Sequence, residues 1–337
     1  TISLCAEQIV YGMAINIFAP ALAAFIYRVY FGSGSSLVQV RLMNTLASTM
    51  ARMEDVNLYA VAARDLSRAQ AFAAQYGFRK AYGSYEELLR DPEVELVYIA
   101  TPHSHHAAHM KLCIEHGKHV LCEKAFTLNA AQAREVAALA KEKGVYVAEA
   151  IWTRYMPSRQ LINEALASGV IGNVSTLTCN LSYPVTYKER IVRPELAGGA
   201  LLDVGVYPVT YLYRLFGKPE RITCKGKMKN GVDLADDICM DFGDGRTVSF
   251  RASVDDFKGF ETLKLEGTEG STKLLLWHTA GKATLKKKHG KDLVVKGSGN
   301  YLNEFDVVAN EIRLGYKESR FVPLQCTVDV MELLDEC

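Results

Sequence analysis

Residues 117–124 read Gly117-Lys118-His119-Val120-Leu121-Cys122-Glu123-Lys124. The glycine ends a run of helical periodicity at 105–116, and a second such run follows at 130–143. A short apolar strand between two helices predicts one strand of a parallel sheet, because right-handed crossovers return the chain to the same sheet. Such a strand delivers its terminal Glu-Lys pair to an edge of the sheet. We therefore expect Lys124 to be part of an active site.

The same alternation continues on both sides of this strand. Apolar runs of strand length lie at 56–62, 94–100 and 145–148, and helical runs lie at 43–53, 66–76 and 85–89. These segments predict an α/β fold that begins with a Rossmann dinucleotide-binding domain over residues 37–150. Its ligand crevice is expected at the carboxyl ends of the strands.

From residue 151 onward the pattern changes to one helix followed by short strands. Turn signals such as Asn230-Gly231 separate these strands, as in antiparallel hairpins. The predicted strands are 174–182, 221–229, 237–242, 247–254, 261–266, 272–276, 282–286 and 292–295. With helices predicted at 157–168, 302–315 and 328–334, residues 151–337 read as an α+β substrate and dimerisation domain with a large, mainly antiparallel sheet.

Composition narrows the range of partners. The chain has 337 residues, enough for two domains that each bury a core, and its 39 Lys+Arg and 38 Asp+Glu leave a formal charge of +1. A net charge this small does not attract a polyanion, so we do not expect a nucleic acid as partner. A small molecule is the expected partner. The eight cysteines form no Cys-x-x-Cys pair, which favours a reduced, cytosolic protein.

The first 36 residues differ from the rest of the chain. No charged side chain occurs from Gln8 to Tyr27, a run of roughly 20 residues, which is the length that spans a bilayer. Asn16 and Pro20 interrupt this run, and no basic segment precedes it, which argues against a membrane anchor or a signal peptide. We predict an atypical hydrophobic leader over 1–36, with an anchor as the alternative.

The phosphate-binding glycines of a Rossmann domain are missing from their expected position. Backbone amides between the first strand and the first helix must approach the pyrophosphate closely, which requires glycine. Here the positions before Arg41 read Val38-Gln39-Val40. Two interpretations stay open: the segment is native and binds its cofactor poorly, or it is read in a shifted frame, in which the same codons would encode Gly-Thr-Gly.

Five segments carry a family resemblance. They are residues 60–64, 100–106, 122–129, 149–155 and 198–207. In this order and spacing the chain resembles the oxidoreductases named for glucose-fructose oxidoreductase and inositol dehydrogenase (the Gfo/Idh/MocA family), and within them the dimeric dihydrodiol dehydrogenase branch. The branch rests mainly on Trp152-Thr153-Arg154. The resemblance implies hydride transfer between a nicotinamide cofactor and a hydroxyl or carbonyl group, and a homodimer.

The resemblance also implies the catalytic residues. Hydride transfer to a carbonyl leaves an alkoxide, so the site needs a proton donor and a nearby positive charge. By the family pattern Tyr207 is the acid/base, Lys124 is the charge that lowers the pKa of Tyr207, and Asp203 orients Lys124. The alternative is structural, with Asp203 capping a helix that begins near Val206 and Tyr207 as a core phenol.

Arg64 indicates which cofactor binds. A strand that ends in Asp or Glu accepts the ribose hydroxyls of NAD, whereas an arginine there pairs with the 2′-phosphate of NADP. We therefore predict NADP, with NAD as the other possibility and an Arg64–Asp65 surface pair as the structural alternative. The resemblance implies that Thr101, Pro102, His105 and the pair Glu123-Lys124 also bind the cofactor, although α-helix entry through Pro102 with a Ser104 cap would explain the same residues. It further implies that Trp152 and Arg154 bind substrate.

Three functions follow from these residues. The first is an NADP-dependent oxidoreductase acting on a trans-dihydrodiol or a sugar-like substrate, the second is a sugar or cyclitol dehydrogenase of the same family, and the third is a catalytically silent scaffold that has lost its glycine loop. His103, His105, His106 and His109 resemble a metal cluster, but no carboxylate or cysteine nearby completes a ligand set, so no metal is expected.

Overall fold

The computed structural model describes Ala47, Met50, Met53 and residues 56–337. The predicted leader at 1–36 and the aberrant glycine segment at 37–40 lie outside the described residues. Of the predicted helix at 43–53, only Ala47, Met50 and Met53 are described, and the first two are helical.

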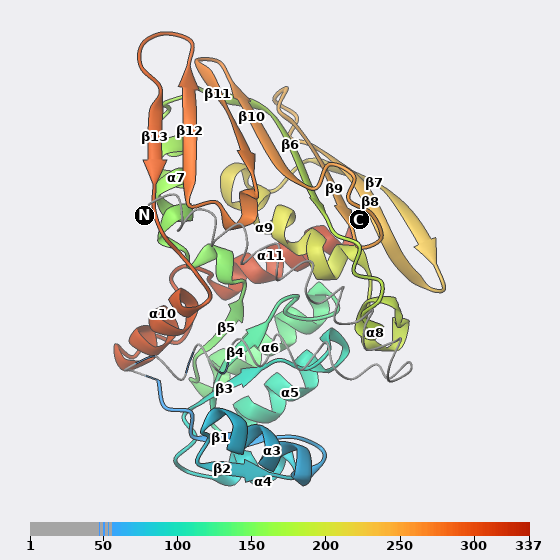
Figure 1. The fold of residues 1–337 in the computed structure, drawn as a ribbon, viewed down its shortest axis with the longest axis vertical. Helices are drawn as coiled ribbons and strands as arrows, with labels where there is room; N and C mark the ends of the chain where they lie inside the picture. Colours follow the sequence, from blue (N-terminus) through green and yellow to red (C-terminus); the bar gives the residue numbers. More distant parts are fainter. Residues whose placement is uncertain (1–46, 48–49, 51–52, 54–55) are drawn as a thin grey trace. The chain divides into compact units, whose positions relative to one another are not determined.

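The described part begins with alternating strands and helices. These are β1 (Ala60–Ala62), α3 (Leu66–Tyr76), β2 (Lys80–Tyr82), α4 (Tyr85–Arg90), β3 (Leu96–Ile99), α5 (His103–Glu115), β4 (His119–Glu123), α6 (Ala130–Lys143) and β5 (Val147–Ala150). β1 pairs with β2, and β3, β4 and β5 pair in that order, all in parallel. The carboxyl ends of β3 and β4 therefore lie next to each other at one edge, which places Thr101 beside the Glu123-Lys124 segment (Figure 1).

Local signals explain why two of these helices begin and end where predicted. Asp65 accepts a hydrogen bond from the backbone N–H of Ser67 at the start of α3, and Gly77 ends that helix in the left-handed conformation, with φ of 80°. Asn129 and Gly144 do the same for α6. Both sets of bounds are confirmed because each depends on its own capping residues.

The C-terminal part is built on an eight-stranded sheet. Its strands are β6 (Val174–Ser182), β7 (Arg221–Lys229), β8 (Val232–Asp241), β9 (Thr247–Ser253), β10 (Glu261–Gly267), β11 (Gly270–Leu275), β12 (Lys282–Lys287) and β13 (Leu293–Lys296). The order is β13-β12-β11-β10-β6-β9-β8-β7, and every pairing is antiparallel except β6 with β9. The predicted fold class, a Rossmann domain followed by an α+β domain with a mainly antiparallel sheet, is confirmed.

Helices and short helical turns complete this part. They are η1 (Trp152–Arg154), α7 (Pro157–Ala167), α8 (Glu189–Val192), η2 (Pro194–Leu196), the π-helix η3 (Leu201–Gly205), α9 (Val206–Phe216), η4 (Trp277–Thr279), α10 (Leu302–Arg313) and α11 (Leu324–Asp335). α11 packs against α6 and β5 of the Rossmann part and against α9 of the C-terminal part, as Figure 1 shows in red. This helix therefore contacts both parts of the chain.

Several predicted bounds were wrong, each for a physical reason. β8 begins at Val232 instead of 237, because Asn230 and Gly231 (φ of 51° and 80°) form a tight turn that pairs Lys229 directly with Val232. Buried Asp236 in that strand hides its apolar pattern. The strand predicted at 56–62 is only Ala60–Ala62, and α11 begins at Leu324, four residues before the predicted 328.

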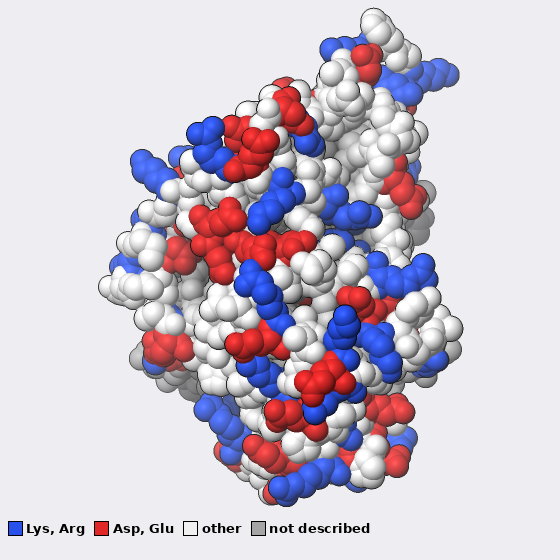
Figure 2. Space-filling model, turned by 180° about the vertical axis from the view of Figure 1, so that it is seen from behind, with Lys and Arg blue, Asp and Glu red and all other residues white. Residues whose placement is uncertain are grey.

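Surface charge and helix hydrophobicity are relevant to the kinds of partner that the protein binds. On the face shown in Figure 2, basic and acidic side chains are interspersed and no large area carries one sign of charge. In the described part of the chain, no helix combines the length and the apolar character needed to cross a bilayer.

Candidate active site

Lys124 lies directly after β4 and reaches across to the C-terminal part. Its side chain is 13% exposed, and its Nζ donates to the backbone oxygen of Asp203 and lies 3.2 Å from Asp203 Oδ1. The same Nζ lies 5.1 Å from the ring centroid of Tyr207. The structure therefore brings the three predicted catalytic residues together, from segments about 80 residues apart in the sequence.

The glycines before Asp203 set the position of the π-helix η3. Asp233 on β8 accepts a hydrogen bond at 2.6 Å from the backbone N–H of Leu201. A Cβ on Gly199, which has φ of 119°, would lie 2.0 Å from Asp233 Oδ1. A Cβ on Gly198 would lie 2.3 Å from the backbone oxygen of Ile191. Only glycine fits at both positions, and this close packing fixes where η3 presents Asp203.

Two cations surround the Asp203 carboxylate. Arg190 Nη1 on α8 donates to Asp203 Oδ1 at 2.6 Å, on the same oxygen that faces Lys124. Burial opposes ionisation of this carboxyl, but the charges of Arg190 and Lys124 hold its pKa well below the usual range. Asp203 accordingly stays ionised and anchors both cations. The alternative in which Asp203 only caps α9 is wrong, since α9 has no side-chain cap and begins after Gly205.

Tyr207 lies in the first turn of α9, and Trp152 is its hydrogen-bond partner. Trp152 Nε1 donates to Tyr207 Oη at 3.1 Å. An indole N–H can only donate, so the phenol oxygen accepts and its own proton remains free for another acceptor. Burial raises the pKa of Tyr207 well above its usual value. The net shift is therefore upward, and burial outweighs the lowering that was predicted from the charge of Lys124.

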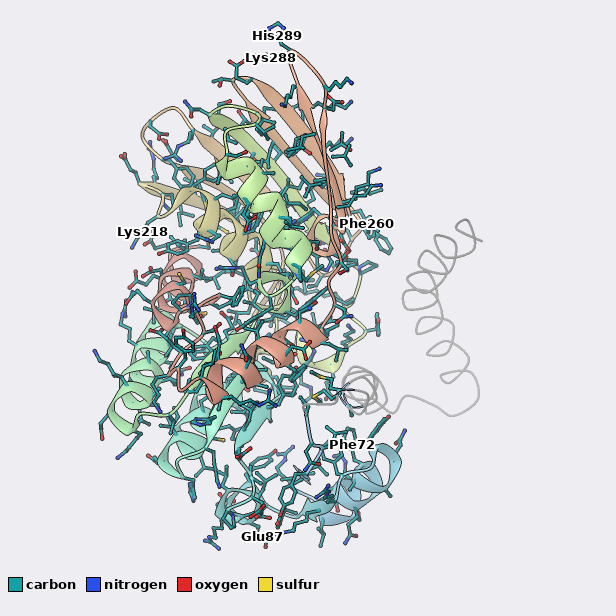
Figure 3. The ribbon with its side chains drawn as sticks, turned by 90° about the vertical axis from the view of Figure 1, so that its left-hand side faces the viewer. Phe72, Glu87, Lys218, Phe260, Lys288 and His289 are labelled. Carbon is teal, nitrogen blue, oxygen red and sulfur yellow. The ribbon has the colours of Figure 1, made fainter. Side chains whose placement is uncertain are left out.

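Aromatic rings surround the phenol of Tyr207. Trp152 stacks on Tyr301, with ring centroids 4.2 Å apart, and His278 lies 6.0 Å from Trp152 and 5.6 Å from Tyr207. Tyr183 approaches His278 at 6.5 Å and packs in turn on Phe260, which is labelled in Figure 3. We call Trp152, Tyr183, Tyr207, His278 and Tyr301 the aromatic cluster. Such a cluster suits a flat or apolar ring better than a strongly hydrated one.

The predicted cofactor residues lie at carboxyl ends of the parallel strands. Arg64 follows β1, its side chain is exposed, and it forms no ion pair with the described residues, whereas the Asp65 carboxylate accepts hydrogen bonds from Ser67. Pro102 is the N-cap of α5 and offers no side-chain cap, so backbone N–H groups of the first turn remain available. The predicted alternative of a Ser104 cap is wrong, since α5 begins at His103.

Three side-chain contacts lie near the carboxyl ends of these strands. Thr101 Oγ1 lies 3.1 Å from His109 Nδ1, and Ser104 Oγ lies 2.9 Å from His105 Nδ1. Glu123 accepts a hydrogen bond from Tyr98, and burial raises the pKa of its carboxyl. A free guanidinium, an uncapped helix N-terminus and polar side chains at one edge fit a dinucleotide. No metal-binding group of three or more His, Cys, Asp or Glu occurs in the residues that the structure describes.

Arg154 does not join this site. Its Nη2 donates to the backbone oxygen of Phe321 at 2.6 Å, and its side chain lines a separate groove. Side chains two positions apart on the turn η1 point about 120° apart, because a 3₁₀-helix has three residues per turn. Trp152 therefore faces Tyr207 while Arg154 faces away, and the prediction that Arg154 binds substrate is corrected.

Sequence reasoning missed four residues of this site: Arg190, Asp233, His278 and Tyr301. Each comes from a strand, short helix or loop far from Lys124 in the sequence, and none belongs to a recognisable motif. His278, for example, lies on η4 and is held by Glu261 of β10, with 2.6 Å between Nδ1 and Oε2. Only the fold brings such residues to Tyr207.

Family models and known proteins match most of this chain. The family described as "Oxidoreductase family, NAD-binding Rossmann fold" (GFO/IDH/MocA) matches residues 37–150, and the GFO/IDH/MocA C-terminal domain matches residues 160–273. The trans-1,2-dihydrobenzene-1,2-diol dehydrogenase of Mus musculus is 37% identical over 288 residues, which cover 82% of this chain and 86% of that protein. The D-xylose 1-dehydrogenase (NADP(+)) of Hypocrea jecorina is 34% identical, covering 76% and 75%.

Solved structures show the same fold at lower sequence identity. A 3-ketoreductase from Actinomadura kijaniata, crystallised with NADP and TDP-benzene, superposes with a TM-score of 0.76 at 21% identity, covering 86% of this chain and 91% of the other. An NAD-binding oxidoreductase from Klebsiella pneumoniae gives a TM-score of 0.75 at 22% identity, covering 90% and 94%. At this identity the likeness shows the fold alone.

Proposed function

The chain belongs to the GFO/IDH/MocA family of NAD(P)-dependent oxidoreductases, and from this premise we propose that it uses NADP to oxidise a trans-dihydrodiol, or to reduce the corresponding carbonyl. The observation that carries the substrate class is the aromatic cluster around Tyr207. A cyclic diol on an unsaturated ring presents both a flat apolar face and a hydroxyl group. The cluster supplies packing for the first and a phenol for the second.

The protein's own groups would move the proton. When bound, the nicotinamide ring accepts or returns a hydride. Tyr207, whose oxygen accepts from Trp152, has a free O–H that donates to the substrate oxygen during carbonyl reduction. Lys124 favours negative charge that develops on that oxygen, and Asp203 holds the ammonium group in place. In the oxidation direction Tyr207 takes the proton of the substrate hydroxyl.

A substrate comparison tests this proposal. We expect the purified protein with NADP to oxidise a trans-dihydrodiol of benzene with kcat/KM at least tenfold above the values for D-xylose and inositol, since a polyol loses hydration against aromatic walls. Initial rates of NADPH formation give the comparison. Higher kcat/KM for xylose would instead support the sugar dehydrogenase alternative, which the Hypocrea jecorina relative favours.

The oxidation rate should depend on pH. Tyr207 must be deprotonated to act as a base, and burial places its pKa above the usual value of about 10, so the ionised fraction grows about tenfold per pH unit below that pKa. We expect kcat/KM for oxidation to rise with a slope near one from about pH 7 to pH 10. Carbonyl reduction uses the neutral phenol and should stay level over the same range. A plateau in the oxidation profile near neutral pH would contradict this assignment.

Arg64 is proposed to select NADP. Replacing Arg64 with alanine should raise KM for NADP by about tenfold or more and leave KM for NAD within twofold, because only NADP carries the 2′-phosphate that a guanidinium pairs with. Arg68→Ala, on the exposed face of α3, is the control. Equal loss with both cofactors would assign Arg64 a role other than phosphate recognition.

Cofactor binding, the oligomeric state and the cellular location remain open to measurement. Titration of the protein with NADPH, followed by fluorescence, tests the silent-scaffold alternative, which predicts no binding up to about millimolar concentration. The homodimer is proposed to form through the open face of the eight-stranded sheet, where a shallow depression of about 450 Å³ is lined by residues such as Thr178, Asn180 and Ser249. The cytosolic location rests on the cysteine spacing and stays a prediction.

A further inference from the structure

A second, larger hollow lies away from Lys124 and Tyr207. This groove, of about 1120 Å³, runs along the C-terminal halves of α7 and α9 and reaches the start of α11. None of Lys124, Asp203 and Tyr207 lines it. We call it the arginine groove, because four arginines line it: Arg154, Arg214, Arg246 and Arg320.

The charges in this groove are unbalanced. Its acidic lining residues are Glu164 and Asp244, and Asp244 is already paired with Arg246 at 2.6 Å. Within the described residues, no carboxylate lies at ion-pair distance from Arg154, Arg214 or Arg320. The charge of Arg214 adds to burial in lowering the pKa of Arg154, so these two guanidinium groups are close enough to repel. Cations that converge without carboxylates favour an anion between them.

Two of the residues that line this groove also carry a buried polar atom without a partner in the described part of the chain. Nη1 of Arg154 is fully buried and makes no hydrogen bond, although Nη2 of the same group donates to Phe321 O. The side-chain oxygen of Asn163 on α7 is likewise buried without a partner, and its amide can turn to present a donor. A buried donor without a partner is unfavourable, so native proteins rarely retain one.

The size and the lining of the groove indicate more than a bare ion. Ligand sites for small organic molecules are hollows of roughly 300–1,000 Å³, and this groove is at least that large. Phe216 and Phe321 supply apolar lining beside the arginines. Arginine presents paired N–H groups that match phosphate oxygens.

We propose that the arginine groove binds a small phosphate ester, with Arg154, Arg214 and Arg320 contacting the phosphate group. Arg154 forms the buried base of this site and is held by the Phe321 carbonyl, while exposed Arg214 and Arg320 close over the anion from α9 and from the segment before α11. The organic part of the ester lies toward Phe216 and Phe321.

Binding to the protein without cofactor or substrate tests the proposal independently of catalysis. Glucose 6-phosphate, AMP and inorganic phosphate are titrated by calorimetry at constant ionic strength, with glucose as the uncharged control. We expect both esters to bind, inorganic phosphate to compete with them, and glucose not to bind. Tighter binding of AMP or of glucose 6-phosphate identifies the source of the phosphate, and either order supports the proposal. No binding of either ester up to about 10 mM overturns it.

Matched variants locate the binding. Arg214→Gln with Arg320→Gln removes two exposed charges and leaves buried Arg154 in place, and it should weaken ester binding about tenfold or more. Lys288→Gln with Lys291→Gln removes the same charge at the β12–β13 hairpin, where Figure 3 labels Lys288, and should leave binding unchanged. Arg64→Ala should also leave it unchanged. Equal loss in the lysine variant means non-specific attraction, and loss in Arg64→Ala means binding at the cofactor site; either overturns the proposal.

Discussion

Tyr207→Phe is expected to lower kcat/KM for both oxidation and reduction by about 10²–10⁴-fold, the usual contribution of a positioned acid or base. The substitution removes a phenol that lies beside both Lys124 and Trp152, and it leaves the ring in contact with its aromatic neighbours. The loss should fall mainly on kcat, because phenylalanine retains the packing surface. Steady-state rates with NADP and a trans-dihydrodiol measure it.

Tyr211 provides the matched control for this experiment. It lies one turn further along α9, is buried, and packs against Arg159 and Trp277. Tyr211→Phe should therefore change kcat/KM by less than about twofold, since these neighbours are not among the proposed catalytic residues. Thermal unfolding of both variants verifies that each is folded. If Tyr207→Phe retained a third or more of the wild-type rate, another group would have to be the acid/base.

The second large effect is expected at Lys124. Lys124→Met should lower kcat/KM by about 10²–10³-fold, because it removes the cation that favours the developing alkoxide. The change also leaves the buried Asp203 carboxylate paired with Arg190 alone, so the net positive charge beside the reacting oxygen is lost. NADPH binding measured by fluorescence separates loss of cofactor affinity from loss of turnover.

Two controls accompany the Lys124 experiment. Lys111→Met removes a partly exposed lysine from α5 that pairs with Glu135 on the surface, and it should be neutral within about twofold. Lys124→Arg keeps the charge but not the compact ammonium geometry, so it should recover part of the activity. Full activity in Lys124→Met would remove this residue from the catalytic group and leave Asp203 without a catalytic partner.

The predictability of the fold depended on how local each signal was. α3 and α6 could be predicted to the residue because their caps, Asp65 with Gly77 and Asn129 with Gly144, are part of the sequence beside them. β8 could not, since its start depends on the pairing of Lys229 with Val232 across the turn. The Rossmann strands could be predicted because they are continuous apolar runs. Strands of the eight-stranded sheet were harder to predict where they carry buried acids such as Asp236.

The candidate site divides in the same way. Lys124, Asp203 and Tyr207 lie in short motifs through which the family resemblance proposed their roles, and Arg64 follows a predicted strand. Arg190, His278 and Tyr301 could not be predicted from the sequence. They reach the site only because the fold brings α8, η4 and the start of α10, respectively, to it. Arg154 shows the opposite error. Its motif suggested a substrate contact, but its guanidinium donates a hydrogen bond to the backbone oxygen of Phe321 instead.

By itself, the sequence determined the order of helices and strands and the two-part architecture, because periodicity and caps are properties of neighbouring residues, and its family resemblance proposed the three catalytic residues. The tertiary structure alone decided the partners of those residues. Asp203 binds two cations, Trp152 donates to Tyr207, and four arginines line one groove, because such contacts join residues that are far apart in the chain. The direction of the Tyr207 pKa shift was likewise decided by burial, which exists only once the chain is folded.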